Sequence, residues 1–371
     1  TRWRANAIRP QCRRPLILKS GWHDDLRNSM NILTLAALGW SDHFASQVEA
    51  DAILLTPPAR ISDVHRARVE AKTVDGDVEL DLPMDIRSGD LAVGDWVLSD
   101  PVEARVVAAL VRRNVLRRRT VASGHRHQLI AANVDSLFIV SSCNADFNPA
   151  RLERYLALAI SSEIEPVLVL TKADMADDAD TYRHSAEGLL PNLKVIVVNA
   201  RDSASLEQMS PWVGRGRTAA LVGSSGVGKS TIMNRLTGIE SATQGIREND
   251  AKGRHTTTAR SLRPTHAGGW LIDTPGMRSL TMSENAEGID VIFSDLIELA
   301  GACKFSNCKH QTEPGCAIRA AIKKGELDES RLLRWLKLQD ENQGNSETPD
   351  EAKARAKGVR PPKKQPSAKR K

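Results

Sequence analysis

The chain has 371 residues, enough for two or three domains. Hydrophobic residues make up 41% and charged residues 26%, which excludes a wholly disordered chain. No apolar run approaches the ~20 residues that cross a bilayer, so we expect a soluble protein without a membrane partner. The net charge is +6 and its excess lies at the two ends.

Both ends of the chain are strongly basic. Residues 351–371 carry a balance of +8 and residues 1–30 a balance of +5, which leaves −7 for the remainder of the total of +6. Basic ends favour attraction to a polyanion. We interpret residues 1–29 as an extension outside the folded protein, with a disordered basic arm as the alternative. We interpret residues 343–371 as a disordered basic tail.

A β-like region, residues 61–120, follows a lead-in at 30–60. Short stretches rich in Val and Leu alternate with turn signals such as Asp75-Gly76, which predicts a small five-stranded barrel of the OB type, a fold common among oligonucleotide binders. The expected strands lie in Val64–Thr73, Val78–Leu82, Asp95–Ser99 and Val102–Val111.

Arginines gather at the end of this barrel region, in a segment, 105–126, that contains no acidic residue. Two interpretations stay open. The arginines form either a solvated charged face or a strip that contacts phosphates, and their mutual repulsion favours the strip. They are Arg105, Arg112, Arg113, Arg117, Arg118, Arg119 and Arg126.

Residues 121–285 alternate apolar strands with helices, which predicts an α/β domain with a mainly parallel sheet covered on both faces. The expected strands are Ser136–Ser141, Pro166–Thr171, Lys194–Asn199, Thr218–Gly223 and Trp270–Thr274, with helices at Pro149–Ser161 and Lys229–Thr237. Residues 286–342 are expected to form a helical domain. Its helices are Ile289–Ala300, Cys316–Lys324 and Glu329–Gln339.

A phosphate-binding loop lies between an expected strand and an expected helix. The segment matches G-x-x-x-x-G-K-[ST], in which glycines let backbone N–H groups wrap the phosphates at a helix N-terminus. Lys229 is expected to reach the β- and γ-phosphates, and the Ser230 hydroxyl to bind Mg²⁺. The expected nucleotide-binding residues here are Gly223, Ser224, Ser225, Gly226, Val227, Gly228, Lys229, Ser230 and Thr231.

Three further motifs follow strands. In Asp273-Thr-Pro-Gly276, the Asp273 carboxylate can hold the Mg²⁺ shell, and the Gly276 N–H can contact the γ-phosphate. In Thr171-Lys-Ala-Asp174, the carboxylate can accept from both N1–H and the 2-amino group of guanine, which adenine lacks, so the motif selects GTP. Asn199-Ala200 is a weaker base-binding element. The expected base-binding residues are Thr171, Lys172, Ala173, Asp174, Asn199 and Ala200.

Thr171 stands where most GTPases have Asn, and we expect it to keep less of the contact between the base motif and the phosphate-binding loop. Lys172 is expected to lie along the base and to contact that loop.

Three cysteines and a histidine are spaced as C-x4-C-x-H-x5-C. Three thiolates and one imidazole close a tetrahedral Zn²⁺ shell with no open position, so we predict a structural metal site. The alternative is a set of incidental cysteines, and the odd total of five argues for a metal in a reducing compartment. The expected ligands are Cys303, Cys308, His310 and Cys316.

The nucleotide motifs run in an unusual order, with both base motifs before the phosphate-binding loop. Ordinary GTPases begin with that loop, so the order resembles a circularly permuted GTPase. With a barrel before it and a Cys/His cluster behind it, residues 30–339 resemble the bacterial ribosome-small-subunit-dependent GTPases. The resemblance implies a cytoplasmic GTP hydrolase, expected to be a monomer, that binds the small ribosomal subunit and its rRNA during late assembly.

The switch segment Gly253–Thr258 is expected to supply a further Mg²⁺ ligand, and we favour Thr257. Met277 follows Gly276 where Ras-like enzymes place a water-orienting Gln, so we expect slow intrinsic hydrolysis. A partner, a potassium ion or His255 would assist it; alternatively, His255 contacts RNA or faces solvent.

Two other functions stay open. In the first, the chain is an RNA-binding assembly module that holds GTP as a structural ligand; the absence of a Gln at position 277 favours this. In the second, it is a metal-dependent RNA-modifying enzyme; the zinc shell, which has no open position, argues against this.

Overall fold

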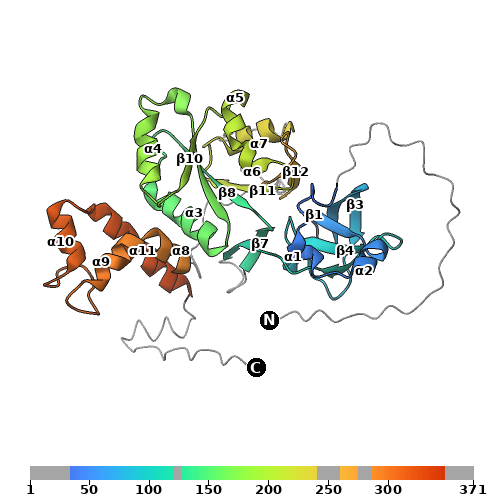
Figure 1. The fold of residues 1–371 in the computed structure, drawn as a ribbon, viewed down its shortest axis with the longest axis horizontal. Helices are drawn as coiled ribbons and strands as arrows, with labels where there is room; N and C mark the ends of the chain where they lie inside the picture. The colour runs from blue at the N-terminus through green and yellow to red at the C-terminus, as the bar shows by residue number, and fades with distance from the viewer. Residues whose placement is uncertain (1–33, 120–126, 240–259, 275–285, 347–371) are drawn as a thin grey trace, which may run out of the picture. The chain divides into compact units, whose positions relative to one another are not determined.

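The computed structural model describes residues 34–119, 127–239, 260–274 and 286–346 (Figure 1). Its first part is a closed barrel with strand order β1-β2-β3-β5-β4, which confirms the predicted barrel. In β2, Val69 and Ala71 point into the barrel and alternate with exposed residues, as a half-buried strand requires. The barrel strands are β1 (Pro58–Val64), β2 (Arg68–Thr73), β3 (Gly76–Asp81), β4 (Trp96–Asp100) and β5 (Arg105–Ala109).

Strand β1 was not among the expected strands. Five successive residues of β1 are buried, and they include Arg60 and Ser62. Buried polar residues and a bulge between Ile61 and Asp63 hide the alternation by which a strand is found in a sequence. Two short helices precede β1, α1 (Asp42–Ala45) and α2 (Ala50–Leu55). After the barrel, β6 (Val115–Arg119) and β7 (His127–Ala132) form a separate antiparallel pair.

The second part is a six-stranded sheet of order β10-β9-β8-β11-β13-β12, parallel except for the antiparallel edge strand β12. This confirms the predicted parallel sheet. Strand β12 was not expected, because three residues give too short a pattern to be recognised. The strands are β8 (Ser136–Ser142), β9 (Glu165–Thr171), β10 (Lys194–Val197), β11 (Thr218–Gly223), β12 (Leu262–Pro264) and β13 (Trp270–Ile272).

Helices cover both faces of this sheet. On one face, α3 (Pro149–Ser161) and α4 (Ala179–Glu187) pack on inward-facing residues such as Ile139 and Leu168. On the other face, apolar residues such as Phe138 and Val169 meet three helices. These are α5 (Ser203–Leu206), α6 (Ser210–Val213) and α7 (Lys229–Thr237).

The third part is helical and packs on α3. Its helices are α8 (Ala286–Ile292), α9 (Ser294–Gly301), α10 (Ala317–Lys324) and α11 (Glu329–Ser346). The single helix expected over Ile289–Ala300 is instead two, because Phe293 leaves helical geometry (φ −106°, ψ 30°) and buries its ring in the core. Helix α11 runs four residues past the expected boundary at 342. Within the described ranges, no helix has the length and apolar character to cross a bilayer.

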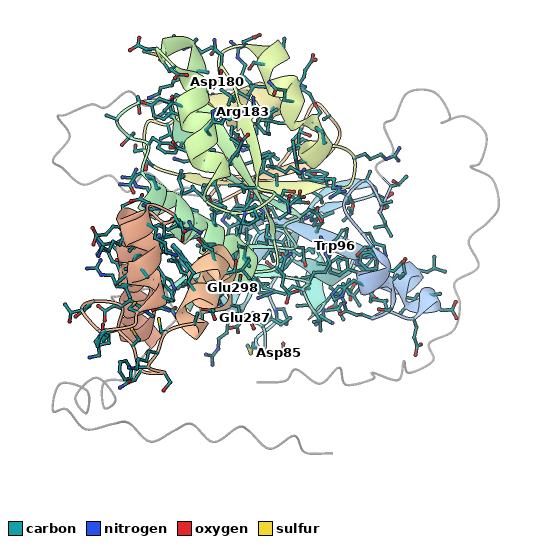
Figure 2. All side chains as sticks on the ribbon, turned by 60° about the vertical axis from the view of Figure 1, so that its left-hand side comes forward. Asp85, Trp96, Asp180, Arg183, Glu287 and Glu298 are labelled. Carbon is teal, nitrogen blue, oxygen red and sulfur yellow. The ribbon has the colours of Figure 1, made fainter. Side chains whose placement is uncertain are left out.

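A buried arginine joins the barrel to the sheet. Arg60 of β1 donates from Nη1 to the Leu38 carbonyl and from Nη2 to Thr218 Oγ1 at 2.8 Å. Burial lowers the pKa of this guanidinium to about 10. Its Cζ lies 5.9 Å from the ring centroid of Trp96, which Figure 2 labels on β4. Thr218 begins β11, so the strand that ends in the phosphate-binding loop starts against the barrel.

Candidate nucleotide site and metal centre

The phosphate-binding loop joins β11 to α7. Gly223, Gly226 and Gly228 have positive φ angles of 142°, 77° and 98°, and a Cβ at Gly223 would clash with the Val140 carbonyl of the neighbouring strand. Only glycine takes up such a backbone without strain. Lys229 opens α7, and its Nζ donates to the carbonyls of Gly223, at 2.8 Å, and Ser224. The ammonium group therefore lies inside the loop.

The two base motifs converge on this loop. Thr171, fully buried at the end of β9, has its Oγ1 2.6 Å from the Val227 carbonyl and 3.1 Å from that of Ser141. A Cβ placed on Gly228 would lie 3.7 Å from side-chain carbons of both Thr171 and Ala200. Three segments that are far apart in sequence thus meet at one edge of the sheet, as the carboxyl ends of parallel strands must.

The residues expected to bind the base lie on tight turns beside this edge. Lys172 has a left-handed backbone (φ 58°), and the exposed Asp174 follows on the 3-10 turn Ala173–Met175. Asn199 is fixed by two hydrogen bonds: its N–H donates to Ser205 Oγ at 3.0 Å, and its Oδ1 accepts from the Arg201 N–H at 2.9 Å. The exposed Asp174 carboxylate is therefore open to a base.

Asp273 follows β13, in the motif expected to bind Mg²⁺. Burial raises the pKa of its carboxyl above the ordinary value, while the charges of Arg263 and Lys229 act in the opposite direction. Thr274, the next residue, donates from Oγ1 to the Leu221 carbonyl of β11. Gly276, Met277, His255 and Thr257 lie outside the described residues.

Three cysteines and one histidine form a compact cluster at the third part, with all four ligand atoms within 4.8 Å of one another. A tetrahedral ion with Zn–S of about 2.3 Å and Zn–N of about 2.0–2.1 Å requires S···S near ~3.8 Å and N···S near ~3.5 Å. Here Cys303 Sγ and Cys316 Sγ are 3.9 Å apart, and His310 Nδ1 lies 3.6 and 3.5 Å from them. The donor set fits zinc.

Local structure holds this cluster together. Cys316 is the N-cap of α10, and its Sγ accepts from the Arg319 N–H at 3.5 Å. His310 is buried, has a left-handed backbone (φ 61°) and lies against the Trp335 ring of α11.

Three of the arginines in the segment 105–126 form ion pairs with carboxylates. Acids from outside their segment pair with them: Asp95 lies 2.7 Å from Arg112, and Asp135 2.8 Å from Arg113. Glu103 lies 2.7 Å from Arg105. The expectation that these three arginines lack compensating acids was wrong, because their partners come from neighbouring loops.

Comparisons with known proteins place these features in a family. A family model described as RsgA GTPase matches residues 109–283. The chain is 53% identical over 318 residues to the small ribosomal subunit biogenesis GTPase RsgA of Mesorhizobium japonicum, covering 84% of this chain and 91% of that protein. The chain belongs to the RsgA GTPase family. It is also 43% identical to RsgA 2 of Vibrio parahaemolyticus, over 87% of this chain and 90% of that one.

Two solved structures share the RsgA fold with this chain. YjeQ from Thermotoga maritima matches with a TM-score of 0.56 at 24% identity, over 77% of this chain and 98% of that one. YloQ, described as a circularly permuted GTPase, matches with a TM-score of 0.55, also at 24% identity, over 79% and 97%. The circular permutation predicted from the motif order and the GTPase activity predicted from the motifs are confirmed, and membership of this family implies binding of GTP and GDP.

Sequence reasoning missed one side chain of this RsgA-type site. Arg151, in the first turn of α3, donates from Nη1 to Ser224 Oγ in the phosphate-binding loop. The two residues are 73 positions apart, and Arg151 belongs to no motif. The only signal in the sequence was a cationic residue at the start of a helix that follows a central strand.

Proposed function

We propose that this GTPase acts in the biogenesis of the small ribosomal subunit. In this proposal, GTP favours the docked state on the maturing subunit and hydrolysis favours release. The observation that carries it is the 53% identity to a small ribosomal subunit biogenesis GTPase over 84% of the chain, well beyond the GTPase segment alone. The work of such a factor is in the cytoplasm, where the subunit matures, and the protein acts there as a monomer.

The nucleotide is bound with Mg²⁺. Ser230, exposed at the start of α7, and Asp273, whose raised pKa the charge of Lys229 acts to lower, are the proposed Mg²⁺-binding residues. The hydroxyl and the carboxylate oxygen are ligands that Mg²⁺ prefers. The proposed switch ligand is Thr257, and His255 is the proposed assisting residue in place of the Gln that Met277 replaces.

The Cys/His cluster holds one structural Zn²⁺. All four positions of a tetrahedral shell are taken by protein atoms, which leaves none for a substrate or a water. This favours a stabilising role and argues against metal-dependent RNA modification.

Binding to rRNA is proposed to run mainly through phosphates. Each phosphate contact releases counterions, so affinity for the subunit must fall steeply with salt. The barrel and the basic ends of the chain are the proposed contact regions.

The test is phosphate release by the purified protein with and without small subunits, at several salt concentrations, with large subunits as the control. We expect a slow basal rate that small subunits raise at least about tenfold, which corresponds to a decrease of about 1.4 kcal/mol in the activation free energy. The stimulation should disappear at high salt. A protein that binds GTP and the subunit without stimulation would be the assembly module considered above.

A further inference from the structure

Arg151 places a guanidinium directly on the phosphate-binding loop from a separate helix. The side chain of Asn148 caps that helix by accepting from the Arg151 N–H at 3.0 Å, so the first turn of α3 is well fixed. Nη1 of Arg151 donates to Ser224 Oγ and lies 3.9 Å from Asp146 Oδ1. The side chain is 39% exposed, so it is anchored but reachable from solvent.

Ser224 is a sensitive point of the loop. Its hydroxyl accepts from Arg151, and its carbonyl accepts from Lys229 Nζ. A residue held from both sides fixes the path of the backbone whose N–H groups must face the phosphates. Removing the guanidinium therefore changes the setting of the loop and of the lysine that reaches the phosphates.

The same helix is clamped to the metal-binding part. Two residues after Arg151, the fully buried Glu153 accepts from Arg334 Nε at 2.9 and 3.0 Å. Arg154 pairs in a bidentate manner with Glu341 of α11, at 2.6 and 3.0 Å. Further along, a Cβ on Gly288 of α8 would clash with the Ala157 carbonyl, so the two helices touch through their backbones.

We propose that Arg151 is a positioning residue of the GTPase site, which acts through Ser224, and that α3 makes its setting depend on the metal-binding part. Arg154 lies three residues from Arg151, about 4.5 Å along the helix axis, so the pair with Glu341 and the contact with Ser224 come from the same turn of α3. This inference deepens the proposed function and rests on GTP hydrolysis at the site.

The test compares basal kcat and KM for GTP in R151M, R151K, S224A and the R151M/S224A double variant. R183M is the matched control, because Arg183 lies on helix α4 of the same domain in an exposed pair with Glu187 (Figure 2). We expect R151M to lower kcat about tenfold, with R151K in between and R183M unchanged. The double variant should be no slower than R151M, because both changes break one contact. The thermal midpoints of R151M and R183M should agree.

Basal kcat of R151M within about twofold of wild type, or losses in R151M and S224A that multiply in the double variant, would overturn the role of Arg151. The dependence on the metal-binding part through α3 is tested by E341Q, which removes the negative charge from the pair with Arg154 and so weakens it. E341Q should slow basal turnover about threefold in the wild-type background and not in R151M. An equal loss in both backgrounds, or none in either, would overturn it. If small subunits fail to stimulate the wild type, the proposed function is refuted, while the ratios of basal kcat among the variants still test the role of Arg151.

Discussion

The clamp between Glu153 and Arg334 should make stability depend on pH in a defined direction. The Glu153 carboxylate is fully buried, and burial raises its pKa, while Arg334, Arg331 and Arg154 lower it. R334M removes the main partner and leaves Arg331 Nη1 at 3.8 Å. Breaking one side of a buried pair costs about 3–5 kcal/mol, and the remaining arginine places the cost near the lower end, about 3 kcal/mol. At about 2 °C per kcal/mol for a chain of this size, the midpoint falls by about 6 °C.

The sign with pH follows from the raised pKa. A carboxyl whose pKa is higher in the folded than in the unfolded protein favours folding below the unfolded value and loses that contribution as pH rises through the folded value. R334M raises the folded pKa further, because it removes a charge that lowers it. The loss in midpoint should therefore be large near about pH 8 and smaller near about pH 5.

Calorimetric melting of wild type, R334M, E153Q/R334M and R183M at both pH values provides the measurement. The double variant should be more stable than R334M near pH 8, since it no longer buries a carboxylate whose remaining partner, Arg331, is 3.8 Å away. R183M should shift by less than about 1 °C, because exposed pairs contribute little. A loss in R334M that is the same at both pH values, together with a double variant as unstable as R334M, would refute the reasoning.

Three further predictions concern the nucleotide site and the metal centre. D174N should lower the affinity for GTP about 100-fold and raise the affinity for xanthosine triphosphate, because an amide N–H donates where xanthine has a carbonyl. Nucleotide competition measures both affinities, and unchanged selectivity would contradict the assignment of Asp174. T171V keeps the volume but leaves the Val227 carbonyl without its buried donor, so nucleotide affinity should fall about fivefold with little change in kcat; an affinity equal to wild type counts against the contact. C316S should reduce bound zinc from one ion per chain to nearly none, and it should lower the melting midpoint of the α8–α11 part. Release of zinc to a chromogenic chelator measures the first effect, and full zinc retention would exclude Cys316 as a ligand.

Features whose chemistry is contiguous in the chain were predictable. The glycines and the lysine of the phosphate-binding loop, and the short Cys/His segment, must lie within a few residues of one another to work, so their spacing identifies them. Helix α7 (Lys229–Thr237) was predicted to the residue for the same reason, since the loop determines where it begins.

Features that depend on distant partners were not predictable. Arg112 finds Asp95 through the fold of the barrel, and Arg151 finds Ser224 only after β8 and β11 have paired. The interruption between α8 and α9 lies at Phe293, whose buried ring packs under Arg331, with the Arg331 Cζ 5.1 Å from the ring centroid. A single sequence records none of these tertiary choices.

The anchoring of two strands at their starts limits how the enzyme can move. Arg60 ties the first residue of β11 to the barrel, and Trp270, the first residue of β13, donates from Nε1 to the Ala37 carbonyl at 2.7 Å. Swinging the barrel away would break the buried hydrogen bond from Arg60 to Thr218, and a buried hydrogen bond from a charged group contributes about 1.5–3 kcal/mol. The barrel and the segment that precedes α1 thus hold the starts of the two strands that lead to Lys229 and Asp273. Movements driven by GTP hydrolysis are therefore expected in segments other than the barrel and the two strands anchored at their starts.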